Sequence, residues 1–329
     1  MDFTELIDLA AEQLGGAVLV ASDDFFAPKE NLLRASTPIF IPDKYTDNGK
    51  WMDGWESRRR RTPGFDWCII RLGLPGIARG VVVDTSFFRG NHPEHCALDG
   101  VTFSGLPTQE ELTSDTVQWA SLLPQMPLKG DSQNPFPIEY AKRITHLRFK
   151  IFPDGGVARL RVHGEVVPDW EQLKRAGGQI DLAAAENGAH ILSCSDMFFG
   201  HRHNLIMPGR AANMSDGWET KRRRGPGHDW LIIRLGRPGQ IKRVEVDTSH
   251  FKGNFPESCS LEACNTDDDA TLTDSTPWAT VLPRTKLQAH TRHYFDEELL
   301  DTGVASHLRF SIYPDGGVSR LRVYGTLVD

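Results

Sequence analysis

The sequence predicts an all-β fold in which two β-sandwich domains follow each other along the chain, with only short helices at their periphery. Three observations lead to this prediction. A long motif occurs twice, short strand-like runs bounded by turn residues follow each copy, and no long helical pattern lies inside either copy. Parallel α/β folds require a helix between successive strands, so the sequence argues against them.

The duplication can be read letter by letter. Residues 53–73 are DGWESRRRRTPGFDWCIIRLG, and residues 216–236 are DGWETKRRRGPGHDWLIIRLG. The same offset of 163 residues continues without a gap from residues 81–91, VVVDTSFFRGN, to residues 244–254, VEVDTSHFKGN. Self-similarity at a fixed offset is the mark of a tandem repeat.

Each repeat is long enough to bury a core of its own, because the chain has 329 residues. We therefore expect a first domain at residues 1–168 and a second at 189–329. Between them, residues 169–188 mix a few apolar side chains with polar ones and contain Gly177-Gly178, which predicts a partly helical linker.

The elements can be expected in order. Apolar residues at helical spacing over Phe3–Leu14, ended by Gly15-Gly16, predict a short amphipathic helix. After the first DGWE motif, the β-branched runs Trp67–Leu72 and Gly80–Asp84 predict two strands, separated by a turn at Leu74-Pro75-Gly76. Each repeat closes on two alternating runs around a Pro-Asp-Gly-Gly turn, at residues 146–166 and 307–327.

Composition limits the class of protein. No apolar run is long enough to span a bilayer, and the acidic N-terminus lacks the basic start and apolar core of a secretory signal, so we expect a cytoplasmic protein without a membrane partner. A net charge of −7 argues against a nucleic-acid partner. The odd number of cysteines and the lack of a CxxC pair argue against a disulfide framework, and we interpret Cys96 and its counterpart Cys259 as small buried hydrophobes.

The duplicated pattern resembles a known family. The DGWE…PGFDW…IIRLG…VDTS…GN pattern and its second copy resemble allantoicase, and the resemblance extends from Ser22 to Val328. The closing LRF…PDGG…RLRV pattern resembles the last strands of galactose-binding-like jelly rolls. The resemblance implies two tandem jelly rolls that hydrolyse allantoate to ureidoglycolate and urea in purine (allantoin) degradation. We also expect a homo-oligomer.

The expected reaction needs a proton for the leaving nitrogen, a base for water and a cation for the substrate carboxylate. Both repeats supply these groups. The candidate acids and bases are Glu56, Asp84, Glu219 and Asp247. The basic runs supply candidate carboxylate ligands, Arg59, Arg61, Arg222 and Arg224. The alternative interpretation is that these runs are solvated, since consecutive side chains cannot all point one way, and that the tryptophans of the motif belong to the core.

The loop after the VDTS strand is the strongest single candidate. It carries Asp84, Arg89 and Asn91 in the first repeat, and Asp247, Lys252 and Asn254 in the second. Loops at the ends of rigid strands often carry function. The alternative is an Asx-type turn, in which the Asp and Asn side chains cap backbone amides and Gly90 or Gly253 supplies a positive φ.

The histidines differ between the repeats. His228 and His250 replace Phe65 and Phe87, so we expect the second repeat to be the catalytic one. No cofactor is certain. The pairs His201/His203 and His290/His293 are compatible with a divalent metal, although neither has the spacing of a known metal motif.

Two other classes stay open. A non-catalytic tandem carbohydrate- or ligand-binding jelly roll would present exposed aromatic platforms and would not need the acids and bases. A cupin-like metal hydrolase would need three or more clustered His or carboxylate ligands.

Overall fold

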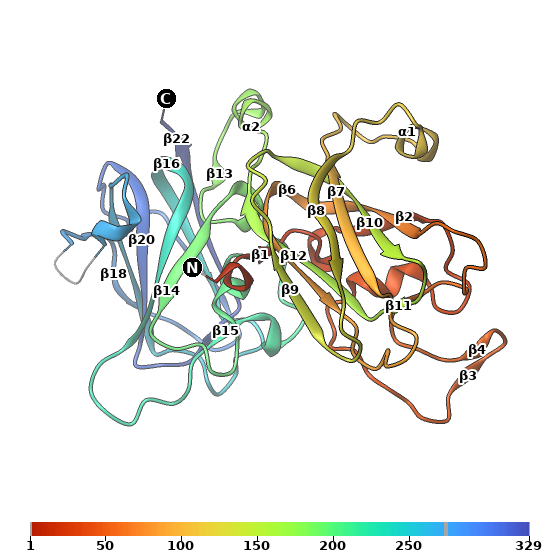
Figure 1. Ribbon diagram of the computed structural model, residues 1–329. Coiled ribbons are helices and arrows are strands. Elements are labelled where there is room, and N and C mark those ends of the chain that lie inside the picture. Colours follow the sequence, from red (N-terminus) through yellow and green to blue (C-terminus); the bar gives the residue numbers. More distant parts are fainter. Residues whose placement is uncertain (1, 273–275, 329) are drawn as a thin grey trace. The chain divides into compact units, whose positions relative to one another are not determined.

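The computed structural model describes residues 2–272 and 276–328, and the chain divides into two compact units, Met1–Val167 and Pro168–Asp329. Each unit consists mainly of antiparallel strands, with a few short helices outside the sheets (Figure 1). The prediction of an all-β fold with two tandem jelly-roll sandwiches is therefore confirmed.

The first unit is built around one long strand, β6 (Asp66–Asp84). The first part of β6 pairs with β2 and β10, and its last part pairs with β9 and β12, so a single strand takes part in both layers of the sandwich. The strands that complete this sheet are β1 (Ile7–Asp8), β2 (Ala17–Ala21), β7 (His95–Val101), β8 (Ala120–Pro127), β9 (Gln133–Pro137), β10 (Ile144–Phe152) and β12 (Arg159–Val166).

The prediction of a turn between two separate strands was wrong. Residues Leu74–Gly76 lie inside β6, where the pairing with β10 shifts register between Arg71 and Gly76. The proline and glycine produce an irregularity in a continuous strand rather than a reversal of the chain.

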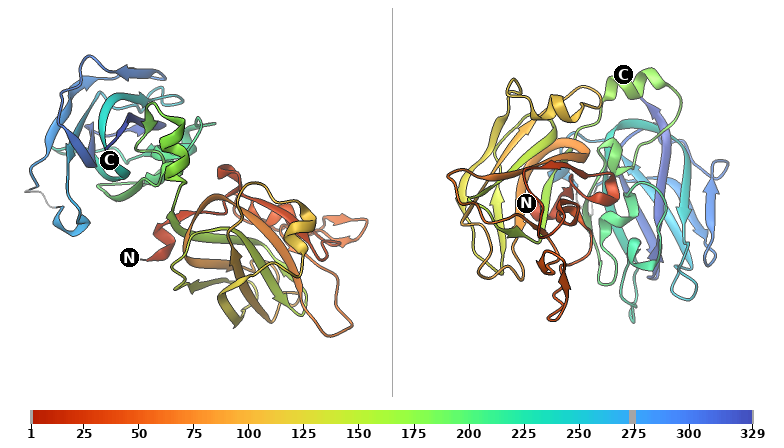
Figure 2. Two further views of the ribbon diagram at one scale, coloured as in Figure 1. Left: turned by 90° about the horizontal axis from the view of Figure 1, so that it is seen from above. Right: turned by 90° about the vertical axis from the view of Figure 1, so that its right-hand side faces the viewer.

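The second unit repeats this topology around β16 (Asp229–Asp247), as the reader can follow by colour in Figure 2. Its other main strands are β13 (Ile180–Asp181), β14 (His190–Cys194), β17 (Ser258–Cys264), β18 (Ala279–Lys286), β19 (Arg292–Phe295), β20 (Val304–Tyr313) and β22 (Arg320–Leu327). Short two-stranded ribbons accompany the main sheets: β3 (Tyr45–Thr46) with β4 (Gly49–Lys50), β5 (Trp55–Glu56) with β11 (Gly156–Val157), and β15 (Trp218–Glu219) with β21 (Gly317–Val318).

The helices are short. The α-helices are α1 (Gln109–Thr113) and α2 (Trp170–Ala176), and the 3₁₀ turns are η1 (Phe3–Glu5), η2 (Glu12–Leu14), η3 (Lys29–Leu33), η4 (Ala185–Asn187), η5 (Arg202–Ile206), η6 (Met214–Asp216) and η7 (Asp269–Thr271). In the part of the chain that the structure describes, none of the helices could cross a bilayer.

The predicted N-terminal helix is not formed. Its residues divide between η1, β1 and η2, because Ile7 and Asp8 pair with β12 and the Asp8 carboxylate accepts hydrogen bonds from the amides of Ala10 and Val162. Tertiary pairing overrides the helical spacing of the apolar residues. The segment predicted as a linker contains α2, and it then adds β13 to the edge of the second sheet through pairing with β22.

The tryptophan of each DGWE motif lies at the centre of a core. Trp55 and Trp218 are fully buried, and their rings lie 6.2 and 6.4 Å from those of Phe149 and Phe310. Each indole N–H donates to a backbone carbonyl, so the buried polar atom is satisfied. The neighbouring glutamate on the same short strand is thereby held at the edge of a rigid core.

The cysteines are free thiols, and Cys68, Cys96 and Cys259 are buried. Burial raises the pKa of the Cys96 and Cys259 thiols to about 12, because a thiolate would lose its hydration. Their interpretation as small buried hydrophobes is confirmed.

A buried ion pair joins the first DGWE motif to β12. The Arg159 guanidinium donates to the Asp53 carboxylate at 2.8 Å and to the Asp53 carbonyl at 3.0 Å, and both side chains are almost completely buried. The same Asp53 carboxylate accepts from the Ile39 amide at 3.0 Å, and Arg159 Nε donates to the Ser36 carbonyl at 3.0 Å. The pair therefore fixes the start of the DGWE strand and the segment that precedes it.

We predict that Asp53→Ala lowers the free energy of unfolding of the first unit by about 3–5 kcal/mol, because it leaves the Arg159 charge buried without its partner. Urea denaturation followed by tryptophan fluorescence would measure the change. The control is Asp216→Ala. The Asp216 carboxylate accepts from the Ala212 amide, and the counterpart arginine, Arg320, donates to the backbone carbonyl of Asp216 and to those of Asn204 and Ser319. Equal losses in the two variants would contradict the importance of this pair.

Candidate functional site

A cavity of about 480 Å³ in the first unit brings several predicted residues together. Glu56, Arg89 and Asn91 lie in its wall with three phenylalanines and a lysine that were not predicted. The complete lining is Phe26, Phe40, Lys50, Met52, Glu56, Phe87, Arg89, Gly90 and Asn91. Apolar walls with a few convergent polar groups are typical of small-molecule sites, and this volume is in their usual range.

Glu56 and Asn91 form the polar centre of this cavity. The Asn91 side-chain amide donates to Glu56 Oε1 at 2.7 Å. Both residues are held by β11: Glu56 pairs with Gly156, and the Gly156 amide donates to the Asn91 carbonyl at 2.8 Å. Backbone hydrogen bonds therefore position the two side chains, although 35 residues separate them in the sequence.

Burial raises the pKa of Glu56, and the hydrogen bond from Asn91 lowers it in part. The two effects have different causes. Removal of water penalises the carboxylate, whereas the amide N–H stabilises it. A carboxyl whose pKa is raised keeps its proton at a higher pH than an ordinary glutamate, as a general acid requires.

Arg89 supplies a cation at the rim of the cavity. Its Nε donates to Asp131 at 3.0 Å, and its side chain is 81% exposed. Asp131 also accepts from the Phe87 amide at 2.7 Å. This contact holds Phe87 at a φ of 70°, a value that favours glycine. The positive φ that we expected at Gly90 and Gly253 is found instead at Phe87 and His250.

Asp84 and Asp247 lie elsewhere. Both are buried, and their carboxylates accept from the amides of Ser86 and Ser249, each at 2.8 Å. The Asx-type turn is therefore the arrangement that the structure shows for both residues. Asp84 does not line the cavity, so we leave both aspartates out of the proposed catalytic group.

In each basic run, every second residue forms an ion pair. Arg58 and Arg60 form ion pairs with Asp23 and Asp66, and Lys221 and Arg223 do the same with Asp196 and Asp229. The four arginines predicted to bind substrate are the other members of each run. All four are exposed: Arg59, Arg61, Arg222 and Arg224. Arg59 and Arg61 do not line the cavity.

The second repeat keeps the central pair but changes what surrounds it. Asn254 donates to Glu219, as Asn91 does to Glu56. His250 stands in place of Phe87, and its Nε2 lies 3.0 Å from the Ala211 carbonyl. Its backbone amide donates to His290 Nδ1 at 2.7 Å, so a histidine replaces Asp131. Lys252 is exposed in the position of Arg89.

The structure does not bring His228 and His250 into one site. His228 stacks on Tyr313 at 4.6 Å, in the wall of a cavity of about 590 Å³ that also contains Trp230, Glu262 and Arg309 but not Glu219 or His250. Burial and the nearby Arg223 charge lower the pKa of His228. This cavity is formed by the outer face of a sheet and is separate from the Glu219–Asn254 pair.

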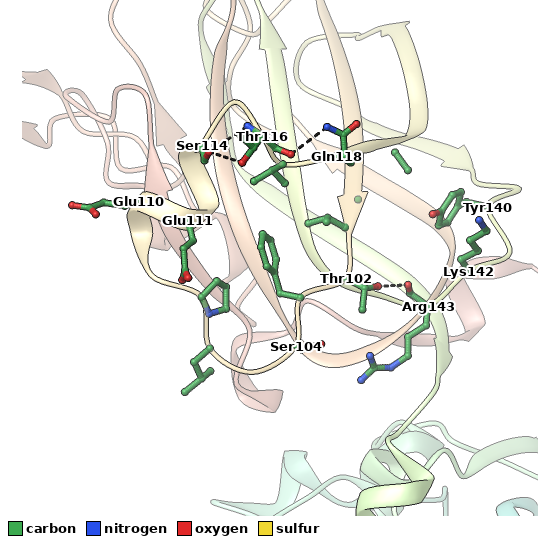
Figure 3. Close-up of a pocket in the computed structure, with 17 residues that line it drawn as sticks. Thr102, Ser104, Glu110, Glu111, Ser114, Thr116, Gln118, Tyr140, Lys142 and Arg143 are labelled. Carbon is green, nitrogen blue, oxygen red and sulfur yellow. Dashed lines mark hydrogen bonds between the residues drawn. The ribbon is translucent and has the colours of Figure 1, made fainter.

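A larger cavity, about 960 Å³, lies under α1 in the first unit and contains no predicted residue (Figure 3). Its acidic side chains, Glu110 and Glu111, come from α1. Glu111 accepts from the Thr108 amide at 2.7 Å as part of a helix cap, and Glu110 points away from the other labelled side chains (Figure 3). If size alone decided, this cavity would be the candidate substrate site. The smaller cavity is the better candidate because Glu56, Asn91 and two cations lie in its wall.

The candidate metal ligands are two pairs of histidines, His201/His203 and His290/His293. Within residues 2–272 and 276–328, no group of three or more His, Cys, Asp or Glu side chains is arranged to hold a metal ion. His290 Nδ1 accepts from the His250 amide, and His293 Nε2 accepts from the Gln288 amide at 2.9 Å. These two rings therefore serve backbone contacts.

Sequence reasoning missed Lys50, Phe40, Phe26 and Met52. A signal for the first two was available: Ser22 matches Ser195 with an offset of 173, whereas Asp53 matches Asp216 with an offset of 163, so the first repeat has ten more residues between these points. Lys50 and Phe40 lie in that longer segment. An insertion beside a candidate site in one copy only is a reason to examine it.

A half-buried carboxyl, an amide and two cations on a rigid β-scaffold define an enzyme-like site for a small polar or anionic molecule. Comparisons of the sequence with known proteins agree with an enzyme of this kind. The allantoicase repeat family matches residues 7–167 and 180–328. A probable allantoicase of Ralstonia nicotianae is 48% identical, covering 99% of this chain and 96% of that protein, and the allantoicase of Dictyostelium discoideum is 45% identical, covering 99% and 88%.

A solved structure is similar as well. The crystal structure of allantoicase from Saccharomyces cerevisiae superimposes with a TM-score of 0.82 at 35% identity, covering 97% of this chain and 93% of that one. Both repeats and nearly the full length are therefore matched. The chain belongs to the allantoicase family.

We predict that Asn91→Leu raises the pKa of Glu56 further, because the carboxylate loses the N–H that stabilises it while its burial remains. A pH titration of the Glu56 carboxyl carbon by NMR would measure the shift. Asn254→Leu, the same change in the second repeat, should leave the Glu56 titration where it is. A fall in the Glu56 pKa in Asn91→Leu would contradict the assigned role of Asn91.

Proposed function

We propose that the chain is an allantoicase, which hydrolyses allantoate to ureidoglycolate and urea, and that its catalytic centre is the Glu56 cavity of the first repeat. The family match over both repeats supports the reaction. The observation that carries the site is the half-buried Glu56 carboxyl, which accepts a hydrogen bond from Asn91 in a cavity with cations at its edge. We further propose that the protein acts in the cytoplasm, in purine (allantoin) degradation, as a homo-oligomer.

The chemistry of allantoate sets what the site must do. One carbon carries a carboxylate, a hydrogen and two ureido groups, and one of its C–N bonds must be replaced by a C–O bond. In the first step, protonated Glu56 donates its proton to the nitrogen of the departing ureido group as the C–N bond breaks, and urea leaves. The lone pair of the remaining ureido nitrogen stabilises the positive charge that develops on the central carbon.

In the second step, water adds to the same carbon. The Glu56 carboxylate, formed in the first step, accepts a proton from this water as the C–O bond forms. The products are ureidoglycolate and urea, and Glu56 has recovered its proton. A single carboxyl thus acts first as acid and then as base, consistent with Glu56 being the one carboxyl among the described residues that line this cavity.

The neighbouring groups have distinct roles in this proposal. Asn91 holds the Glu56 carboxyl in one orientation through the 2.7 Å hydrogen bond. The Nη atoms of Arg89 have no hydrogen bond within the described residues, since its contact with Asp131 uses Nε, and they can therefore donate to the substrate carboxylate. The phenylalanine rings keep the number of waters near the reacting carbon small, which strengthens the polar contacts.

The ligand-binding alternative is not favoured. A tandem carbohydrate-binding protein would not need a half-buried carboxyl with a raised pKa in a phenylalanine-lined cavity. The relatives that match nearly the whole chain are named allantoicases or probable allantoicases.

We predict that Glu56→Gln lowers kcat for urea release from allantoate by about a hundred- to ten-thousandfold, the usual contribution of a general acid or base. Glutamine keeps the size and the contact with Asn91, so the melting temperature should change little. Coupled urea detection over a range of allantoate concentrations would give kcat and KM.

Glu219→Gln is the matched control, because Glu219 occupies the equivalent place beside Asn254. We expect it to keep most of the wild-type kcat. The reverse outcome, an inactive Glu219→Gln protein and an active Glu56→Gln protein, would move the catalytic centre to the second repeat, as the histidines had suggested.

A further inference from the structure

One segment distinguishes the two repeats beside the catalytic cavity. Residues 34–52, here called the arm, connect η3 to the first DGWE motif, and their counterpart in the second repeat is residues 207–215. The difference equals the ten residues by which the offset between the repeats changes. The arm contains the hairpin β3–β4, which projects beyond the sandwich of the first unit (Figure 1).

The arm is fixed at both ends. Near its base, the Ile39 amide and the Ser36 carbonyl bind the buried Asp53–Arg159 pair. At the hairpin turn, the Asn48 side-chain amide donates to the Phe25 carbonyl at 2.8 Å. Beside it, Gly49 lies against the Phe26 ring, since a Cβ there would be 3.7 Å from that ring. These contacts place the arm over the Glu56 cavity.

The arm completes the wall of that cavity. Phe40 stacks on Phe87 with ring centroids 5.8 Å apart and an angle of 21° between the rings. Lys50 lies with its ammonium 4.6 Å from the centre of the Phe40 ring. Phe40, Lys50 and Met52 all contribute to the cavity lining. The second repeat shows the consequence of a shorter segment: Phe199, the counterpart of Phe26, is 62% exposed.

Lys50 has its ammonium group available for a ligand. Within the described residues it forms no ion pair with a carboxylate, and its recorded contact is the one with the Phe40 ring. The neighbouring Lys44 lies over Trp51 instead, at 3.9 Å. A lysine held in a cavity wall by an aromatic ring, with its ammonium donors unused, is suited to bind an anion.

We propose that Lys50 is a specificity-determining residue, which binds the substrate carboxylate together with Arg89, and that the arm thereby confines turnover to the first repeat. This inference rests on the proposed function. The two cations belong to the same cavity wall, and Glu56 with Asn91 forms its polar centre. A substrate with a carboxylate at one end and a ureido group at the other can satisfy both sets at once.

The two proposed carboxylate ligands, Arg89 and Lys50, contribute in different ways. Arg89 is already oriented by Asp131 and offers a planar pair of donors. Lys50 offers a point charge that comes from the arm, on a different segment of the chain. The second repeat retains a cation at the Arg89 position, as Lys252, but has no counterpart of Lys50 or Phe40. Its Glu219–Asn254 pair therefore lacks half of the proposed carboxylate site.

The test is kinetic. We expect Lys50→Met, which keeps most of the side-chain length, to raise KM for allantoate by about ten- to a hundredfold, the loss of one charge-assisted contact, with kcat within about threefold of wild type. Lys50→Arg should recover most of the affinity. The melting temperature should stay unchanged, and added salt should raise KM more in the wild type than in Lys50→Met.

A binding measurement separates recognition from turnover. Calorimetric titration with allantoate should show the same loss of affinity when Lys50→Met is introduced as a second substitution into the Glu56→Gln protein. Lys252→Met is the matched control in the second repeat, and it should change neither KM nor the binding constant.

The outcomes are distinguishable. If wild-type protein releases no urea from allantoate, the proposed function fails. If it does so and Lys50→Met keeps the wild-type KM and binding constant, the inference about Lys50 fails alone. An effect of Lys252→Met equal to that of Lys50→Met would overturn the claim that the arm restricts catalysis to the first repeat.

Discussion

The buried ion pair between Asp53 and Arg159 is the constraint on which the proposed catalytic cavity depends. Two charges in a core cost hydration, and the structure offsets this by giving Arg159 three carbonyl acceptors besides the carboxylate. The same ion pair fixes two segments of the chain. On one side it holds the DGWE strand that presents Glu56, and on the other it holds the arm through Ile39 and Ser36. The positions of the Glu56 carboxyl and of the cavity wall are therefore coupled.

The two repeats show how one scaffold can diverge while its chemistry-bearing pair remains. Both keep the glutamate on the short strand and the asparagine that donates to it, because both are fixed by backbone pairing to the ribbon strand that follows the Pro-Asp-Gly-Gly turn. What differs is the surroundings. His250 bonds to Ala211 where Phe87 stacks on Phe40, and a shorter segment leaves Phe199 exposed. In our proposal, the second repeat therefore keeps the glutamate but lacks the cavity wall that would bind the substrate.

Much of the fold could be predicted from the sequence, because strand alternation and turn residues are local signals and occur twice. The N-terminal segment was mispredicted as a helix, since the pairing of Ile7 with Gly164 is a contact that no local pattern contains. Glu56, Asn91 and Arg89, which line the cavity of the proposed site, could be singled out because they recur, identical or as a similar residue, in both repeats. The register that sends Arg58 and Arg60 to Asp23 and Asp66 cannot be read from four consecutive arginines, so the sequence could not show which members of the run form ion pairs. Substrate binding by Arg59 and Arg61 stays a prediction. Lys50 has no counterpart in the second copy, so matching the repeats residue by residue could not reveal it, and only the ten-residue difference in length pointed to its segment.

A crystal structure of the Glu56→Gln protein with allantoate bound tests the central claim most directly. We expect one molecule in the cavity of the first repeat, with its carboxylate at Lys50 and Arg89 and a ureido nitrogen at the side-chain amide introduced at position 56. Allantoate bound beside Glu219 in the second repeat, or in the first-repeat cavity with its carboxylate directed away from both cations, would contradict it.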